Sequence, residues 1–283
     1  MRRPVSLLAL VLAGSCWLAG ATLQLPEQVT AGQGFSVQTS GSGSSTLYLF
    51  GPAAASKHKV KLGTAVEIEG NEVAAAGRYA LVLDGASTSF FVSPGPVSSL
   101  AFIARPSRVP AAKQDVVSGT AFLLDRNQNL VLSPQTVTFT LTVPGAPDVQ
   151  RTEQSRGGVA WTRLDSSRRA GAAQFVARAG DASVRRVVQE VAGEPCNIRM
   201  SAQRGNGGTI LVQTDPIHDC AGNPVPDGTI VTFTSVDGSG RNTVDARIKR
   251  GIAQAELPGS ASASISVAAG VVVGNEIHWG GGR

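Results

Sequence analysis

The stretch DCAGNPVPDGTIVTFT, residues 219–234, combines a turn with a strand and decides the fold. Gly222 can take a positive φ, Asn223 tolerates one, and the prolines that follow favour an extended exit from the turn. A closely similar stretch, DRNQNLVLSPQTVTFT, stands 94 residues earlier at 125–140. Its Asp, Asn, Val and VTFT run fall in register with the later copy, so the chain contains an internal repeat.

The strand that follows the turn has a period of two. Val137, Phe139, Leu141 and Val143 point one way and the intervening threonines the other, as in a strand with one buried face. A second echo sets residues 158–160, GVA, against 251–253, GIA. A spacing near 94 residues corresponds to one sandwich per repeat and is much too long for a solenoid unit. The sequence therefore predicts an all-β protein made of tandem immunoglobulin-like β-sandwiches.

These residues resemble a known family. The pattern DxxGNPVPxGxxVTF, together with residues 100–111, LAFIARPSRVPA, is similar to the bacterial Ig-like repeat, the Big-1 domain, of the invasin and intimin adhesins. The resemblance covers about 97–279 and is strongest in the last repeat. In the earlier repeat Gln128, Leu130 and Leu132 replace the glycine and the two prolines. The resemblance implies rigid surface rods or stalks that display a tip, in which most single repeats bind nothing themselves.

Composition and linkers suggest three domains after a leader. Hydrophobic residues make up 42% of the 283-residue chain and aromatic residues only 5%, which suits many short strands joined by Gly- and Pro-containing turns. We expect a small Ig-like β domain at 22–95, ending in the stiff linker SPGP, and invasin-type domains at 97–192 and 194–280.

The N-terminus predicts export. A short basic start with Arg2 and Arg3 precedes an apolar stretch and then the small-x-small sequence of residues 19–21. Residues 1–21 are therefore expected to be a secretory signal peptide. An alternative is a lipoprotein signal in which Cys16 becomes the lipidated first residue. The expected location is the periplasm, the cell surface or the extracellular space, and a membrane is involved only through such a lipid tether.

Two cysteines, Cys196 and Cys220, remain after the leader, and an even pair in an exported protein suggests a disulfide. Residues 197–203 and 209–217 read as two strands of a hairpin around the turn at 205–208. Folding this hairpin brings Cys196 close to Cys220 at its open end. The bond would stabilise the fold by about 3 kcal/mol through loop closure.

The sequence shows no motif for catalysis, a cofactor or a resident metal. The histidines His58, His218 and His278 form no ligand pair, and there is no nucleophile elbow, P-loop or dinucleotide fingerprint. A loop calcium site is one interpretation of four neighbouring aspartates and ordinary turn capping is the other. These aspartates are Asp215, Asp219, Asp227 and Asp237.

The net charge of the chain does not identify a partner. The formal net charge is +5, and several arginines gather in the middle of the chain, where we expect a solvated strand face, with an anionic partner as the alternative. They are Arg163, Arg168, Arg169, Arg178, Arg185 and Arg186. No aromatic residues interleave with them, so nucleic acid is not expected. We expect a non-enzymatic, exported structural or adhesion-type protein, whose Ig-like domains serve as a spacer or interaction module at the cell surface or in the periplasm. Its protein or glycan partners are unknown. The alternative is a carbohydrate-binding module or an accessory module of a secretion or pilus assembly.

Overall fold

The computed structural model describes residues 22–280, and within them nearly all regular structure is β-strand. The exceptions are two short 3-10 turns, Gly70–Val73 and Asn206–Gly208. The strands form three sandwiches, each with its own apolar core. The all-β prediction and the sandwich architecture are therefore confirmed. The predicted signal peptide, 1–21, and the alternative lipidation site, Cys16, lie outside the described residues.

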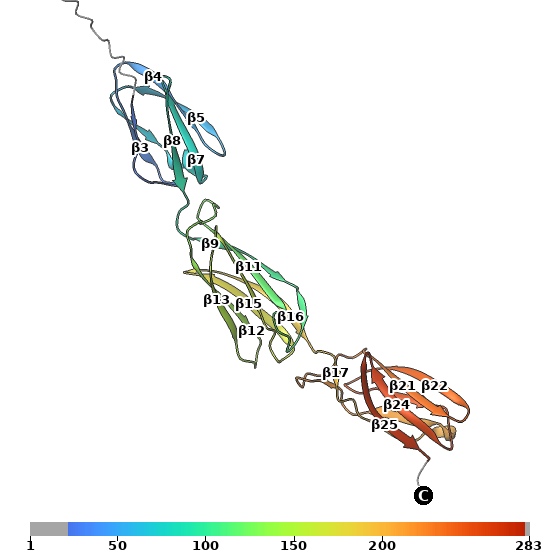
Figure 1. Ribbon diagram of the computed structural model, residues 1–283. Helices are drawn as coiled ribbons and strands as arrows, with labels where there is room; N and C mark the ends of the chain where they lie inside the picture. The colour runs from blue at the N-terminus through green and yellow to red at the C-terminus, as the bar shows by residue number, and fades with distance from the viewer. Residues whose placement is uncertain (1–21, 281–283) are drawn as a thin grey trace, which may run out of the picture. The chain divides into compact units, whose positions relative to one another are not determined.

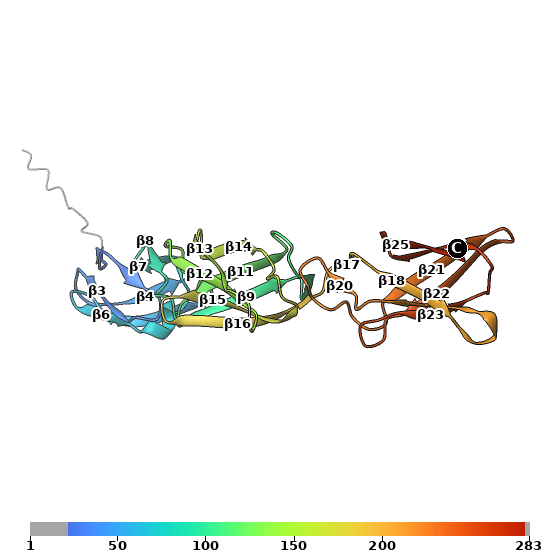
Figure 2. The same cartoon turned by 90° about the horizontal axis from the view of Figure 1, so that it is seen from below.

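The first sandwich contains eight strands: β1 (Leu23–Gln24), β2 (Val29–Thr30), β3 (Phe35–Thr39), β4 (Ser44–Phe50), β5 (Ala55–Lys61), β6 (Ala65–Ile68), β7 (Gly77–Leu83) and β8 (Ala86–Ser93). A sheet of order β1–β3–β6 faces a sheet of order β2–β8–β7–β4–β5 (Figure 1). Figure 2 shows β6 beside its partner β3. The buried Tyr79 donates its hydroxyl to the carbonyl oxygen of Ala75 at 2.8 Å, which resembles the tyrosine corner of Ig-type sandwiches.

The second sandwich also has eight strands: β9 (Ser99–Arg105), β10 (Arg108–Pro110), β11 (Val117–Leu124), β12 (Thr136–Thr142), β13 (Val149–Gln154), β14 (Val159–Leu164), β15 (Gly171–Ala179) and β16 (Ala182–Val191). A sheet of order β9–β11–β14 packs on one of order β10–β16–β15–β12–β13. The rings of Phe102, Phe139 and Phe175 meet in the core at centroid distances of 5.0–6.2 Å. Gly119 packs so closely against these rings that a Cβ at this position would lie 2.6 Å from the Phe175 ring.

The third sandwich is built from β17 (Pro195–Cys196), β18 (Met200–Arg204), β19 (Ile210–Thr214), β20 (His218–Asp219), β21 (Ile230–Asp237), β22 (Gly240–Arg247), β23 (Gln254–Leu257), β24 (Ala263–Ala269) and β25 (Val272–Trp279). A sheet of order β18–β19–β23 faces one of order β22–β21–β24–β25. The short strands β17 and β20 pair separately beside them.

The repeated strand has the orientation that its alternation predicts. Val137 and Phe139 of β12 are fully buried, and so are their counterparts Val231 and Phe233 of β21. Burying a residue of this size stabilises the folded state by about 1.5–3 kcal/mol, so the same strand contributes to the stability of both cores. The threonines between them lie on the other face of the strand.

By their contacts, the residues group into two compact units. One is Met1–Pro96 together with Arg126–Asn129, and the other is Val97–Asp125 together with Leu130–Arg283. The turn that opens the repeat, Arg126–Asn129, thus groups with the first sandwich, although it follows β11 of the second in sequence.

Candidate functional site at the repeated turn

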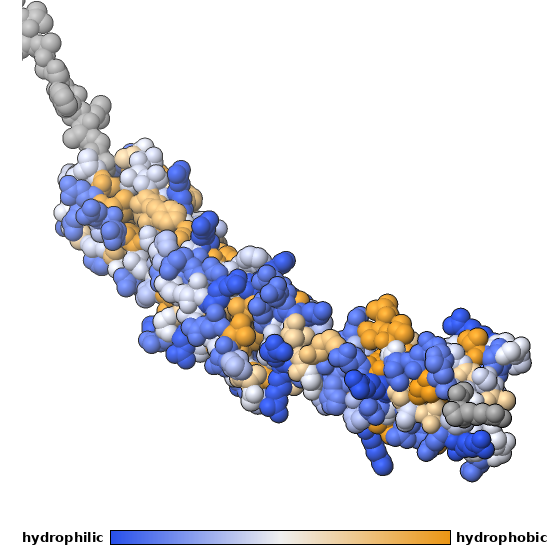
Figure 3. All heavy atoms as spheres, turned by 60° about the horizontal axis from the view of Figure 1, so that its bottom comes forward, coloured by the Kyte–Doolittle hydropathy of each residue, from blue (hydrophilic) through white to orange (hydrophobic). Residues whose placement is uncertain are grey.

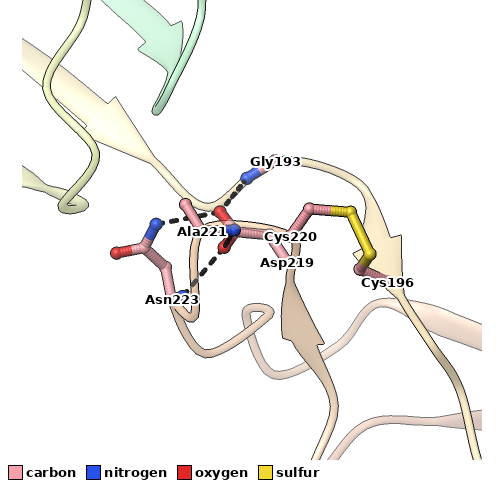
Figure 4. The surroundings of a disulfide bond; sticks show 6 residues. All are labelled: Gly193, Cys196, Asp219, Cys220, Ala221 and Asn223. Carbon is pink, nitrogen blue, oxygen red and sulfur yellow. Dashed lines mark hydrogen bonds between the residues drawn. A yellow bond between two sulfur atoms is a disulfide. The ribbon is translucent and has the colours of Figure 1, made fainter.

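The turn of the last repeat is organised by the buried carboxylate of Asp219 (Figure 4). One oxygen, Oδ1, accepts the backbone N–H groups of Ala221 at 2.9 Å and Asn223 at 2.8 Å. The other, Oδ2, accepts the N–H of Gly193 at 2.8 Å and the side-chain amide of Asn223 at 2.9 Å. Gly222 has a φ of 88°, as its place in the turn predicts, whereas Asn223 has no positive φ and contributes through its side chain.

The electrostatics of Asp219 follow from these four bonds. Burial alone would raise the pKa of its carboxyl group. The hydrogen bonds from the side chain of Asn223 and from the backbone N–H groups of Gly193, Asn223 and Ala221 outweigh it, so the pKa lies below its ordinary value. Asp219 is therefore ionised at neutral pH, and a charged acceptor strengthens every bond that it receives.

A disulfide closes the chain next to this carboxylate. Cys196 of β17 is bonded to Cys220, with a Cα–Cα distance of 5.0 Å (Figure 4). The expected hairpin is formed by β18 and β19, and the pairing continues through β17 and β20, where Cys196 lies opposite His218. The disulfide expected between the two cysteines is thus present, and it joins the segment that leads into the third sandwich to the turn itself.

The amide of Asn223 reaches into the second sandwich. Its Nδ2 donates to the carbonyl oxygen of Arg168 at 2.9 Å, and its Oδ1 accepts the N–H of Ala170 at 2.8 Å. Both residues lie in the loop between β14 and β15. A single side chain thus satisfies one acceptor and one donor of a loop that belongs to the preceding sandwich.

The loop between β14 and β15 is also held in place by contacts within the second sandwich. The hydroxyl of Ser166 donates to the carbonyl oxygen of Pro110 at 2.7 Å. The N–H and the hydroxyl of Ser167 both donate to Oε2 of the fully buried Glu190, at 2.8 and 2.7 Å. Burial raises the pKa of the Glu190 carboxyl, against the opposing effect of the Ser167 bonds. The receiving loop is therefore ordered by contacts that do not involve Asn223.

The earlier repeat makes the same pair of bonds. The Nδ2 of Asn129 donates to the carbonyl oxygen of Ala74 at 2.8 Å, and its Oδ1 accepts the N–H of Ala76 at 2.8 Å. Ala74 and Ala76 lie just before β7 of the first sandwich. All three residues precede their counterparts by the repeat length of 94: Ala74 and Arg168, Ala76 and Ala170, Asn129 and Asn223. We call this pair of bonds the asparagine joint.

The asparagine joint was missed by reasoning from sequence, which assigned the asparagine only a tolerance for positive φ. A signal was present, however. Between the two copies of the turn the glycine and both prolines are replaced, whereas the asparagine stays in register. A residue needed only for the turn would be expected to change with the rest of the turn.

Replacing Asn223 by Ala should loosen this joint. The variant loses both bonds to the loop and one to Asp219, which is expected to lower the free energy of unfolding by about 1–2 kcal/mol. Hydrogen exchange of the Ala170 amide should also accelerate. Asn275→Ala is the matched control, because Asn275 makes the same pair of bonds to the backbone of Met200 within the third sandwich. Equal Ala170 exchange in both variants would contradict the joint.

The degraded turn keeps its backbone shape at a cost. Gln128 stands where the last repeat has Gly222, and it adopts a φ of 65°. A residue other than glycine in this left-handed region costs about 1–2 kcal/mol. Glycine avoids this cost but loses more conformational entropy on folding, which offsets part of the gain. Gln128→Gly is therefore expected to raise the free energy of unfolding by about 0.5–1 kcal/mol in denaturant titration. A lower value in the variant would mean that the Gln128 side chain makes a compensating contact.

Two of the other aspartates singled out by sequence, Asp227 and Asp237, cap turns of their own. Asp227 accepts the N–H groups of Arg250 and Gly251, and Asp237 accepts the N–H of Ser239. These bonds come first among the effects that lower the pKa of Asp227. Within residues 22–280 no three His, Cys, Asp or Glu side chains are arranged to hold a metal ion. The calcium interpretation therefore has no support from the described side chains.

The predicted arginine cluster is dispersed over several elements. Arg163 lies on β14, Arg178 on β15 and the pair Arg185 and Arg186 on β16. Arg168 and Arg169 belong to the loop that receives Asn223. Arg163 is the member with an aromatic partner, since its guanidinium lies 5.7 Å from the centroid of the Trp161 ring. None of the helical segments described is long and apolar enough to cross a bilayer.

Comparison with known proteins gives the fold. No family model and no curated protein matches the chain. Among solved structures, the chain is similar to FdeC, an adhesin of Escherichia coli, with a TM-score of 0.60 and 14% identity over 91% of this chain and 95% of that one. It is also similar to InvD of Yersinia pseudotuberculosis, with a TM-score of 0.53 and 11% identity over 92% and 96%. The chain thus has the tandem immunoglobulin-like fold of these bacterial proteins.

Proposed function

We propose that this chain is a non-enzymatic, exported protein of the adhesion type, in which the Ig-like sandwiches serve as a spacer and interaction module at the cell surface. The observation that carries the proposal is the asparagine joint, which occurs twice with the same donors and acceptors. In both repeats the asparagine of the turn holds one backbone donor and one backbone acceptor of a segment 53–55 residues earlier in the chain. Repetition of the same contact along the chain suits a spacer built from repeated Ig-like units.

Further observations support the proposal. The disulfide fits an oxidising, extracytoplasmic compartment. FdeC, whose fold this chain shares, is described as an adhesin. The proposal includes secretion through residues 1–21 and a division into domains at 22–95, 97–192 and 194–280. Each of the three ranges contains its own core and its own pair of facing sheets, which supports this division.

A carbohydrate-binding module is the second candidate. The observation in its favour is Trp161, whose side chain is 55% exposed on β14 with the Arg163 guanidinium beside it. Exposed aromatic rings can stack on sugars, and guanidinium groups bind carboxylated or sulfated ones. Trp161 is the one exposed aromatic residue described on its sheet face, since Phe122 on the same face is half-buried, and this makes the candidate weaker than an adhesion-type protein that contacts other proteins.

Attachment of bacteria tests the proposal. A strain that lacks the gene should lose at least about tenfold in attachment to cultured host cells or to neighbouring bacteria, and the wild-type gene should restore it. The double variant Asn129→Ala, Asn223→Ala should restore only part, because both joints are weakened, whereas the control Asn275→Ala should restore attachment fully. Unchanged attachment of the deletion strain to every surface tested would refute the proposal.

A further inference from the structure

One sheet face of the second sandwich differs from the corresponding faces of the other two. In the sheet β9–β11–β14, the even-numbered residues of β11 face away from the core. Each of them is flanked by one residue of β9 and one of β14, so the side chains on this face form rows of three. In the central row Thr120 lies between Ile103 and Trp161. Ile103 is 50% exposed and Trp161 55%. On the side of the molecule seen in Figure 3, apolar residues form separate patches among polar ones.

The neighbouring rows extend this surface in two ways. On one side Phe122 lies between Ala101 and Val159, which adds apolar area. On the other side Ser118 lies between Arg105 and Arg163, both exposed. Neighbouring strands are about 4.8 Å apart, so the two arginines flank the serine at about 10 Å from one another. We call these three rows the outer face of the second sandwich.

The other two sandwiches carry no large apolar side chain in the corresponding row. The repeat that sets residues 158–160 against 251–253 places Gln254 at the position of Trp161. The central row of the third sandwich is Ser201, Gln213 and Gln254, and that of the first sandwich is Gln24, Gln38 and Ala65. The fold therefore does not require an apolar outer face, and the isoleucine and tryptophan of the second sandwich need another explanation.

Charge indicates the chemistry of the occupant. Residues 97–192 contain 12 basic and seven acidic residues, a formal charge of +5. Residues 193–280 contain six basic and eight acidic residues, and 22–96 four and five, so the positive charge belongs to the second sandwich. On the outer face itself the charged side chains are Arg105 and Arg163. An occupant that covers the apolar rows and meets these arginines has to carry carboxylates beside an apolar centre.

We propose that the outer face of the second sandwich is the docking surface for a protein partner with an apolar centre flanked by carboxylates. Tryptophan and arginine are the residues that most often dominate protein interfaces. A sugar fits less well, because Ile103, Phe122 and Val159 offer no hydrogen bonds and the guanidinium of Arg163 lies over the Trp161 ring. This inference rests on the proposed adhesion-type function and names the surface that would serve it.

A displayed library of random 15-residue peptides tests this surface with the purified full chain as the target. Enriched peptides should combine aromatic or aliphatic residues with Asp or Glu. Their affinity should fall at least tenfold for the double variant Ile103→Ser, Trp161→Gln, which introduces the residues found in the corresponding row of the third sandwich. Arg105→Gln, Arg163→Gln should lower affinity for the acidic peptides and reduce its dependence on salt. Val187→Gln, which replaces an exposed apolar residue on β16, is the matched control and should change nothing.

Trp161 also reports binding directly. A bound peptide should shift its fluorescence to shorter wavelength and protect it from iodide quenching, with Trp279→Phe used to remove the second described tryptophan. Peptides that bind Ile103→Ser, Trp161→Gln as tightly as the wild type would overturn the proposal, and so would enrichment without acidic residues. A glycan that binds this face in an array, or a dimer that these substitutions abolish, would likewise overturn it. Such a failure would leave the attachment test of the proposed function unaffected.

Discussion

The double substitution Cys196→Ser, Cys220→Ser is expected to lower the free energy of unfolding of the third sandwich by about 3 kcal/mol. The two cysteines are 24 residues apart, and opening a loop of this length gives the unfolded chain about that much additional conformational freedom. The loss is large relative to the total stability of a single domain, about 5–15 kcal/mol. Thermal unfolding with and without a reductant measures it.

The location of the disulfide sharpens this expectation. Cys220 follows Asp219 directly, and Cys196 lies in the segment that leads into the third sandwich from Gly193. Breaking the bond should therefore also accelerate hydrogen exchange at the N–H of Gly193. The second sandwich contains no cysteine, and its unfolding transition serves as the internal control. A third sandwich that unfolds at the same temperature in the presence of reductant would contradict the expected contribution.

Replacing Asp219 by Asn is expected to lower the free energy of unfolding by a similar amount, about 3 kcal/mol. Each carboxylate oxygen accepts two N–H groups, so whichever position becomes NH2 leaves two donors without an acceptor. A lost hydrogen bond to a charged group costs about 1.5–3 kcal/mol. Denaturant titration of the wild type and the variant gives the difference. A variant as stable as the wild type would show that water replaces the lost acceptor.

The pH dependence provides a second readout for Asp219. Because its pKa in the folded protein is lowered, the carboxylate stabilises the fold above its unfolded pKa of about 3.9. This contribution is lost as the pH falls through the lower, folded pKa. The wild type should therefore lose more stability between pH 5 and pH 2 than Asp219→Asn does. Parallel curves for the two proteins would contradict the assignment.

Much of the fold could be predicted because its determinants are local. The alternation around Phe139 identifies a half-buried strand, and the glycine and prolines around Asn223 identify the turn before it. The cysteine pair could be predicted because the hairpin between Cys196 and Cys220 is short enough to count along the sequence. In each case the interacting residues are near one another in the chain.

The site could not be predicted, because its partners are distant. The acceptor and donor of Asn223 lie 55 and 53 residues earlier, in another sandwich, and nothing in their own side chains identifies them, since both contribute backbone groups. The outer face of the second sandwich could not be predicted for the same reason. Ile103 and Trp161 are 58 residues apart in sequence, and they share a row, on either side of Thr120, only through the order of the strands β9, β11 and β14.

Sequence reasoning also grouped residues that the fold separates. Arg163 and Arg178 are close in the sequence, but one lies on the three-stranded sheet and the other on the five-stranded sheet of the second sandwich. The arginine that shares the outer face with Arg163 is Arg105, 58 residues earlier in the sequence. Charge density along the chain predicted the sign of the surface but not which arginines share it.

Binding of labelled Fab fragments raised against the second sandwich, measured on intact cells, tests the proposed role most directly. If the chain is an adhesion-type surface protein, intact cells should bind the Fab as strongly as permeabilised cells do, and a deletion strain should bind none. Fab that blocks the outer face should also reduce attachment. Binding that appears only after the cells are permeabilised would contradict the proposed surface role.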